Sequence, residues 1–254
     1  MGIIYHAVQR EPVVREVAIK LIKEGMDTRE TLARFSFERQ TLARLDHRYI
    51  ARLYDAGSTE LGRPFFVMEF VHGVPLTAYC AEHRLTIRER VELFIKICEG
   101  VEHAHQNGVI HRDLKPSNIL VSSSDEGRAE PHIIDFGIAR LLHPLQDMPG
   151  MTAMTTPGAA VGTPEYMSPE QAGANPSLVD TRTDVYAIGV MLYEAMSGAL
   201  PFDGERLRNA TPEQRKRIIE VETPPRPSQR ASRAASAALA ERNCIHARRL
   251  TGQL

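Results

Sequence analysis

Apolar and polar residues alternate through the first part of the chain in the pattern typical of β-strands. Residues 3–8 and 13–22 are short runs rich in β-branched side chains, and the second run alternates apolar with polar positions. Strand character returns at residues 52–55 and 64–71. We therefore predict that residues 3–71 form mainly strands, with one helix among them.

That helix is predicted over residues 28–45. Leu32, Phe35, Leu42 and Leu45 fall on one side of it, as the helical period requires. The segment supplies the apolar face that would cover the predicted sheet.

Helices dominate the pattern from residue 76 onward. Residues 86–107 predict a long amphipathic helix, and Thr86 followed three residues later by Glu89 matches a capping box. Residues 185–196 are almost continuously apolar, which predicts a buried helix. Strands first and helices second predict an α+β architecture with two lobes that meet near residues 71–73.

Composition adds few constraints on this picture. The chain has 254 residues and a formal net charge of -1, which argues against a protein that binds nucleic acid through bulk charge. No apolar run approaches the ~20 residues of a membrane span, and the first residues do not resemble a signal peptide. The cysteines lack metal-ligand spacing: Cys80, Cys98 and Cys244. We therefore expect buried or idle thiols in a reducing compartment, the cytoplasm.

The chemistry is concentrated in one run, His111-Arg112-Asp113-Leu114-Lys115-Pro116-Ser117-Asn118, which is followed downstream by Asp135-Phe136-Gly137. The first run matches the pattern H-R-D-L-x-x-x-N at every fixed position. An acid that receives a hydroxyl proton, a nearby Lys, an Asn and a second Asp are the groups that phosphoryl transfer with Mg²⁺ requires.

With these motifs the chain resembles a eukaryotic-like, bacterial Hanks-type serine/threonine protein kinase catalytic domain. The resemblance extends from residue 2 to about residue 228. It implies the bilobal protein-kinase fold and transfer of the ATP γ-phosphate to Ser/Thr hydroxyls of protein substrates. Asp113 would accept the proton, Lys115 would neutralise the transferred group, and the Mg²⁺ ligands would be Asn118 and Asp135.

Lys20 ends Val17-Ala18-Ile19-Lys20, which matches the V-A-I-K strand signature. By resemblance Lys20 contacts the nucleotide phosphates and pairs with a helix glutamate. Glu38 is preferred over Glu30 for that glutamate, because Phe35, Glu38 and Leu42 fall on one helix face.

The resemblance also implies an adenine site at the lobe boundary. Met68 would be the gatekeeper, the backbone of Glu69 and Val71 would bind adenine, and Ala18, Leu120 and Ile4 would enclose the ring. Gly2 would be the third glycine of the loop that covers the phosphates. An apolar stack of Leu42, Leu53, His111 and Phe136 would connect the lobes, with Asp184 beneath the His111 backbone.

Residues 162–170 resemble the end of a kinase activation segment, with Ser168-Pro169-Glu170 in place of A-P-E. Thr163 would contact Asp113 and Lys115. A Thr-rich loop precedes the segment, and Arg112 could pair with a phosphate there. The sites expected for autophosphorylation are Thr155 or Thr156, with Thr152 behind them, and self-association would serve that reaction.

Both ends depart from the family pattern. The first strand and two glycines of the phosphate-covering loop are absent, which predicts a new sheet edge at residues 3–8. We therefore divide one truncated kinase domain into an incomplete N-lobe (1–71), a C-lobe (72–228) and an Ala/Arg-rich tail (229–254), helical or disordered. Helices expected after this tail are also missing, which predicts an exposed apolar patch. The usual arginine partner of Glu170 is lacking unless Arg242, Arg248 or Arg249 substitutes.

The sequence is compatible with three functions. The leading one is an active protein kinase, whose longer parent could be membrane-anchored. The second is a weak or inactive kinase-fold scaffold. A small-molecule phosphotransferase is disfavoured by Lys115 and residues 162–170, which suit a peptide substrate.

Overall fold

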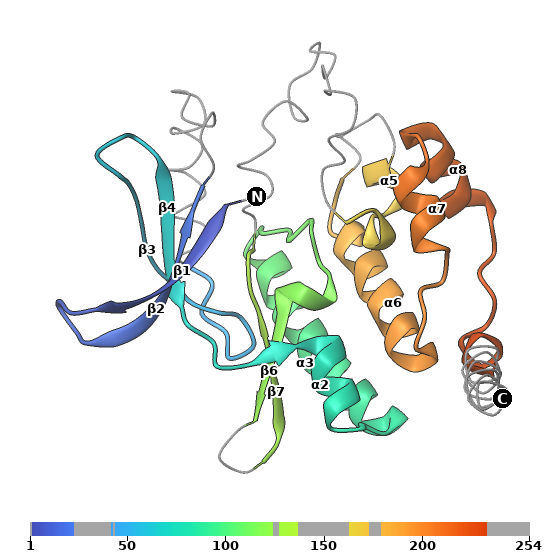
Figure 1. The fold of residues 1–254 in the computed structure, drawn as a ribbon, viewed down its shortest axis with the longest axis horizontal. Coiled ribbons are helices and arrows are strands. Elements are labelled where there is room, and N and C mark those ends of the chain that lie inside the picture. The colour runs from blue at the N-terminus through green and yellow to red at the C-terminus, as the bar shows by residue number, and fades with distance from the viewer. Residues whose placement is uncertain are drawn as a thin grey trace, which may run out of the picture.

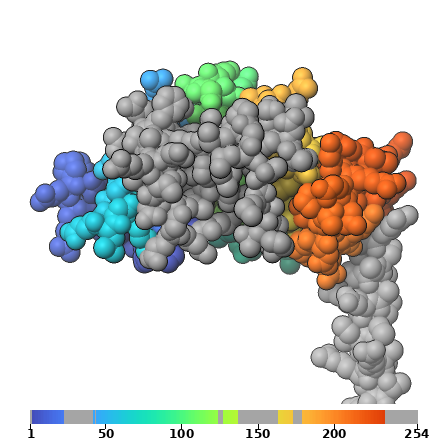
Figure 2. All heavy atoms as spheres, turned by 90° about the horizontal axis from the view of Figure 1, so that it is seen from above, coloured from blue at the N-terminus to red at the C-terminus, as the bar shows by residue number. Residues whose placement is uncertain are grey.

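The computed structural model describes residues 2–22, 42, 44–123, 127–136, 163–172 and 179–232. Within these ranges an antiparallel sheet forms one end of the molecule and a group of helices forms the other (Figure 1). Figure 2 shows the same separation from above, with the N-terminal strands and the helices near residue 220 at opposite ends. This arrangement of a sheet lobe and a helical lobe agrees with the predicted α+β class.

The N-terminal sheet has four strands in the order β1-β2-β4-β3. The strands are β1 (Ile3–Gln9), β2 (Arg15–Leu21), β3 (Leu53–Ser58) and β4 (Pro64–Glu69). All the pairs are antiparallel, and their register places Ala18 opposite Met68 and Lys20 opposite both Ile4 and Phe66. Since facing residues of antiparallel strands share one face of the sheet, Lys20, Ala18 and Met68 lie on the same side.

The prediction of a strand from residue 13 was wrong at its start. Gln9 pairs with Arg15, so residues 10–14 form the loop of the β1–β2 hairpin. Val13 and Val14 are 62% and 73% exposed there. Their β-branched side chains suggested a strand, but β1 has no residue left to pair with them.

The predicted helix at 28–45 falls mostly outside the described residues. Leu42 is helical and buried, whereas Leu45 lies after the helix. The Leu45 amide donates to the Leu42 carbonyl at 3.1 Å, so the chain turns there while the Leu45 side chain stays in the core.

A second, smaller sheet of order β5-β6-β7 lies in the helical part and was not predicted. Its strands are β5 (Val74–Pro75), β6 (Ile119–Ser123) and β7 (Ala129–Ile133). The helical elements around it are α2 (Leu76–Glu82), α3 (Ile87–Gln106), η1 (Pro116–Asn118), η3 (Pro164–Tyr166), α5 (Pro169–Ala172), α6 (Arg182–Ser197), α7 (Gly204–Asn209) and α8 (Pro212–Val221). Helix α3 packs on β7 and on α6, so it connects the small sheet to the helices (Figure 1).

One apolar core joins the two parts of the molecule. It includes Phe66 of β4, Ile97 of α3, Ile119 of β6, Ile133 of β7 and Met191 of α6, all 1% exposed or less. A second cluster unites α5, α7 and α8 through Ala172, Leu207, Ile218 and Ile219. Burial of Leu114 in the first core holds the run His111–Asn118 between α3 and β6.

Helix α6 is less buried than its apolar sequence predicted. Ala187, Val190 and Met191 face the core, but Val185 is 61% exposed. An apolar run in a helix still has a second face, and here that face is turned outward. Helix α3 likewise exposes Ile87, Val91 and Ile95. In the described ranges no helix has both the length and the apolar character needed to cross a membrane.

The capping box predicted for α3 is present. The Glu89 amide donates to Thr86 Oγ1 at 3.3 Å, and the Thr86 amide donates to Glu89 Oε2 at 2.7 Å. These bonds satisfy two backbone donors that the first turn of a helix otherwise leaves unpaired. The Thr86 hydroxyl also donates to Glu89 Oε2 at 2.7 Å, and this bond, followed by that of the Thr86 amide, lowers the pKa of Glu89 from its ordinary value of 4.5.

We expect Thr86→Ala to lower the free energy of unfolding by about 1 kcal/mol, because the first turn of α3 loses its cap. Urea denaturation at pH 7 measures this change. Thr77→Ala, an exposed position in α2, is the matched control and should change stability far less. Because the native state lowers the pKa of Glu89, its contribution is present at neutral pH and disappears as the pH falls through that pKa. An equal loss in both variants would contradict a capping role.

Candidate active site

The run His111–Asn118 lies in the chain between the end of α3 and the start of β6. The His111 side chain is fully buried, and its Nε2 donates to the Ile134 carbonyl at 2.9 Å. This leaves Nδ1 to accept from the Asp113 amide at 3.3 Å. A neutral imidazole with its proton on Nε2 satisfies both contacts, so His111 fixes the backbone that leads to Asp113.

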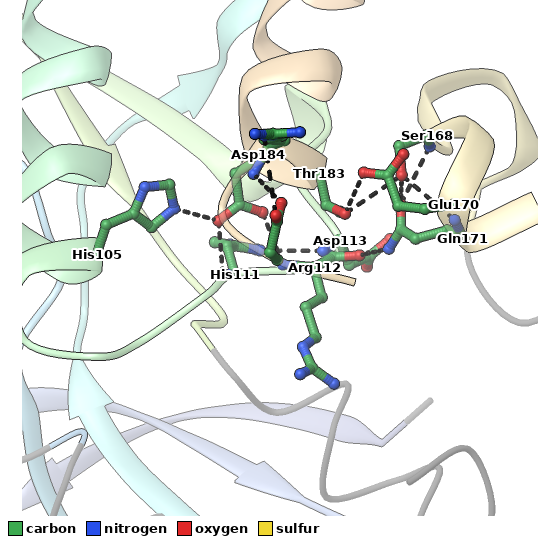
Figure 3. A network of polar contacts seen from close by, with 11 residues as sticks. His105, His111, Arg112, Asp113, Ser168, Glu170, Gln171, Thr183 and Asp184 are labelled. Atoms are coloured by element: carbon green, nitrogen blue, oxygen red, sulfur yellow. Dashed lines mark hydrogen bonds and ion pairs between the residues drawn. The ribbon is translucent and has the colours of Figure 1, made fainter. Parts of the chain in front are cut away.

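Asp184, in the first turn of α6, anchors this loop from below. Its Oδ2 accepts from the His111 amide and from His105 Nε2, each at 2.8 Å, and its Oδ1 accepts from the Arg112 amide at 2.8 Å. Figure 3 shows the carboxylate between His105 and the loop backbone. Asp184 therefore lies beneath His111, as the resemblance implied. His105 was missed, because one histidine in the last turn of a helix has no distinguishing pattern.

The loop gathers three of the expected polar residues. Lys115 Nζ lies 2.7 Å from Asp113 Oδ2. The Asn118 side-chain amide donates to the Asp113 carbonyl at 2.8 Å and lies 3.4 Å from Asp113 Oδ2. All three side chains are at least half buried, so these contacts hold the Asp113 carboxylate in a defined orientation. Among the described residues Thr163 has no hydrogen bond to Asp113 or Lys115, although such a contact was expected.

Lys20 of β2 and Asp135 form a second charged pair. Lys20 Nζ lies 2.7 Å from Asp135 Oδ2, and the side chains are only 9% and 16% exposed. The other oxygen, Asp135 Oδ1, is buried and has no hydrogen-bond partner among the described residues. Next along the chain Phe136 is buried, with its ring centroid 4.7 Å from that of His111. Glu38, the partner expected for Lys20, lies outside the described residues.

The expected adenine-site residues come from several strands. Ala18 and Met68 are cross-strand neighbours on β2 and β4, while Ile4 lies on β1 and Leu120 on β6. Leu53, another member of the expected stack, packs against the core that contains Leu42.

The backbone after β4 is partly occupied by its own hydrogen bonds. The Glu69 amide donates to the Arg52 carbonyl at 2.9 Å, and the Val71 carbonyl accepts from the Gly73 amide at 3.0 Å. The Val71 amide has no partner in the described part of the chain, so it is a free donor for a ligand.

Gly2 lies against the end of β2. A Cβ atom at this position would lie 2.1 Å from the Leu21 carbonyl oxygen, so only glycine fits without backbone movement. Close packing on β2 thus accounts for this glycine, whether or not a phosphate lies above it.

Two oxygen atoms of the expected ligand residues suit a hard divalent cation. Asp135 Oδ1 is unpaired, and Asn118 uses its amide nitrogen for hydrogen bonds, which leaves its carbonyl oxygen available. The described residues contain no cluster of three or more His, Cys, Asp or Glu side chains that could hold a metal. Two protein oxygens completed by phosphate and water are the arrangement that Mg²⁺ accepts readily. The residues present therefore fit a cation bound together with a nucleotide.

The segment from Thr163 to Ala172 returns to the loop through α5. Glu170 Oε1 accepts a hydrogen bond from Thr183 Oγ1 at 2.7 Å, next to Asp184 in α6 (Figure 3). Tyr166 donates to Glu194 Oε2 at 2.7 Å, and burial together with this bond raises the pKa of Tyr166 well above its ordinary value. The remaining expected residues lie outside the described ranges: Thr152, Thr155, Thr156, Arg242, Arg248 and Arg249.

The cysteines that the structure describes show no sign of activation. Burial raises the pKa of the Cys80 thiol. Cys98 is exposed, and partial desolvation followed by the nearby Glu102 and Glu99 carboxylates raises its pKa, so both thiols stay protonated near neutral pH.

The family model described as "Protein kinase domain" matches residues 1–248. The chain belongs to this family. The match covers nearly the whole sequence and agrees with the loop geometry described above. The family uses ATP together with a divalent metal ion.

Similar curated proteins are bacterial serine/threonine-protein kinases. The chain is 39% identical over 197 residues to pkn2 and 38% identical over 242 residues to pkn3, both of Myxococcus xanthus. It is 36% identical over 196 residues to PknB of Mycobacterium tuberculosis. These alignments cover 77%, 92% and 75% of this chain, but only 23%, 42% and 30% of the relatives. The chain thus spans less than half the length of these proteins.

Solved structures agree with the fold. The PknI kinase domain of Mycobacterium tuberculosis has a TM-score of 0.62 at 25% identity, over 87% of this chain and 77% of that one. A single-residue mutant of the same domain has a TM-score of 0.61 at 27% identity, over 80% and 72%. The bilobal kinase fold predicted from the sequence is confirmed.

We expect Asp184→Asn to lower the free energy of unfolding by about 2 kcal/mol. Asparagine has one side-chain oxygen in place of two, so its NH₂ group would face a backbone N–H donor and leave that donor unpaired. Guanidinium denaturation measures the loss. Asp203→Asn is the matched control: Asp203 caps α7 by accepting from the Arg206 amide, and asparagine caps equally well. If the two variants were equally stable, Asp184 would not be the anchor of the loop.

Proposed function

We propose that this chain is the catalytic domain of a serine/threonine protein kinase that transfers the ATP γ-phosphate to Ser or Thr hydroxyls of proteins. The observation that carries the proposal is the placement of Asp113: Lys115 contacts its carboxylate, Asn118 donates to its backbone carbonyl, and the loop that carries it is held by Asp184. A buried ion pair of Lys20 and Asp135 belongs to the same proposed site. These groups suit phosphoryl transfer, which depends mainly on positioning and charge stabilisation.

In the proposed reaction Asp113 orients the substrate hydroxyl and accepts its proton. The hydroxyl oxygen forms a bond to the γ-phosphorus while the bond from that phosphorus to the β,γ-bridging oxygen breaks, and ADP leaves. Lys115, 2.7 Å from Asp113, is placed to neutralise charge on the transferred group. Asp113 must then pass the proton to solvent before another turnover.

Mg²⁺ is the proposed cation, and when bound it would neutralise charge on the β- and γ-phosphates. Asn118 and Asp135 would hold it through the two available oxygens. Lys20 would contact the phosphates and pair with Glu38. Adenine would lie between Ala18, Ile4 and Leu120, beside Met68, with the backbone of Glu69 and Val71 at its edge and Gly2 near the phosphates.

Several wider features belong to the same proposal. The lobes divide near residues 71–73, with residues 229–254 as a tail, and protein substrates dock beside Thr163 and Glu170. The domain works in the cytoplasm, where ATP is supplied, and contact between copies serves autophosphorylation.

A kinase-fold scaffold without catalysis is the competing function, and one experiment separates the two. We expect the chain to transfer ³²P from [γ-³²P]ATP to itself and to a generic basic protein, and Asp113→Asn to reduce the rate at least about 100-fold. Asp46→Asn, an exposed acid paired with Arg52, is the matched control and should keep the full rate. If Asp113→Asn and the parent chain incorporate equal label, the proposed chemistry is wrong, and nucleotide binding without transfer would support a scaffold.

We further expect autophosphorylation on Thr155 or Thr156, with Thr152 as a weaker site, because a phosphate there can pair with Arg112. Incubation with Mg-ATP followed by intact-mass measurement and peptide mapping would locate it. Arg112→Gln should weaken the effect of that phosphate on the transfer rate. A fully active protein without phosphate anywhere in residues 138–163 would refute this expectation.

A further inference from the structure

A glutamine of α5 binds the backbone of the catalytic loop directly beside Asp113. Gln171 Nε2 donates to the Arg112 carbonyl at 2.6 Å (Figure 3). On the other side of the same residue, the Arg112 amide donates to Asp184 Oδ1 at 2.8 Å. Both backbone polar groups of Arg112 are therefore held by side chains from elements far away in the sequence.

Arg112 needs such support because its backbone is strained. Its φ is 67°, in the left-handed region that residues with a side chain rarely adopt. Such a conformation persists only where surrounding contacts fix it. Without them the peptide can relax, and the relaxation would move Asp113, the next residue.

The orientation of the Gln171 amide follows from its neighbours. The Ser168 amide, which can only donate, lies 3.1 Å from Gln171 Oε1. The Arg112 carbonyl can only accept, so Nε2 must point to it. Reversing the amide would place two donors together and two acceptors together. The hydrogen bonds therefore fix one orientation of the Gln171 side-chain amide, which links the Ser168 and Arg112 backbones.

Ser168 adds a second restraint on this side chain. Ser168 is fully buried, and its hydroxyl oxygen lies 3.3 Å from both Gln171 Oε1 and Thr183 Oγ1. The same oxygen accepts from the backbone N–H of Gln171 at 3.4 Å. Thr183, which precedes Asp184 in α6, gives its own hydroxyl proton to Glu170 Oε1, so the single Ser168 hydroxyl proton serves either Thr183 Oγ1 or Gln171 Oε1. The Ser168 amide holds Gln171 Oε1 in either case, and the contacts link Asp184 through Arg112, Gln171 and Ser168 to α6. Ser168 occupies the position where the A-P-E pattern has alanine; an alanine would lose the hydroxyl contacts to Thr183 and Gln171 and keep the backbone bond to Gln171 Oε1.

We propose that Gln171, oriented by Ser168, is a positioning residue that fixes the Arg112–Asp113 peptide and so couples the end of the activation segment to the catalytic acid. This inference rests on the proposed kinase function for its catalytic consequence. Gln171 does not touch the reacting atoms. It acts through the backbone of Arg112, and small displacements of a catalytic group cost large factors in rate.

The first test compares Gln171→Met, which keeps the size of the side chain and removes the donor, with Gln214→Met. Gln214 is the matched control, because it also accepts a backbone hydrogen bond, from Thr211 at the start of α8, far from the catalytic loop. We expect Gln171→Met to lower kcat about tenfold with KM for ATP within about twofold, since the loss of one hydrogen bond should act on the placement of Asp113. Gln214→Met should leave both constants unchanged.

The second test uses Gln171→Glu and its pH profile. At pH 8 the carboxylate faces the Arg112 carbonyl without a proton to donate, so we expect a loss larger than that of Gln171→Met. When protonated at lower pH, the carboxyl can donate to that carbonyl. The activity relative to the unchanged protein should therefore rise between pH 8 and pH 6, and a purely structural role would not produce this reversal. Ser168→Ala should give a smaller loss of kcat with the same unchanged KM.

Hydrogen exchange separates failure of this inference from failure of the proposed function. Amides of residues 112–114 should exchange faster in Gln171→Met than in Gln214→Met, whether or not the chain transfers phosphate. If the chain without any substitution transfers no phosphate, the kinase proposal is refuted. The hydrogen-exchange comparison then still tests the role of Gln171. Equal kcat and equal exchange in the two methionine variants, or a pH profile of Gln171→Glu parallel to that of the unchanged protein, would overturn the role of Gln171. If Gln171→Met does not fold, Ser168→Ala and the pH profile decide.

Discussion

The Asp184 carboxylate is the interaction on which the catalytic loop depends. A fully buried charge is costly, and it is tolerated here because three donors surround it: two consecutive backbone amides and His105. Those amides belong to His111 and Arg112, so the carboxylate fixes the peptide geometry just before Asp113. The His111 ring then contacts both Phe136 and the Ile134 carbonyl, which carries the same constraint to the Lys20–Asp135 pair.

Much of the fold follows from local sequence patterns. The four strands of the N-terminal sheet, the α3 helix and its capping box are visible in the order of apolar, polar and capping residues, because each depends on neighbours within a few positions. The small sheet was not predictable in this way. Its first strand has only two residues, Val74 and Pro75, and its pairing with β6 is long-range. For Val185 the apolar sequence predicted more burial than the structure has, since an apolar residue in a core helix can still face outward.

The proposed site shows the same division. Asp113, Lys115 and Asn118 lie close together in the sequence, so a short motif finds them. The contact of Lys20 with Asp135 and that of His105 with Asp184 join distant segments, and no local pattern announces them. Gln171 was passed over because a glutamine after Pro169 and Glu170 has no chemistry of its own. Its importance arises only once the fold brings α5 beside Arg112.

The left-handed backbone of Arg112 has a consequence for how this position tolerates change. Any replacement with a Cβ atom inherits the conformational strain, about 1 kcal/mol or more, while it discards the guanidinium. Glycine discards the guanidinium too, but it adopts a φ of 67° freely. Alanine and glycine at position 112 therefore remove the same charge at different conformational cost. The difference between them reports the strain that this residue stores in the native loop, reduced by the larger conformational entropy that glycine loses on folding, and it is independent of anything the arginine side chain binds.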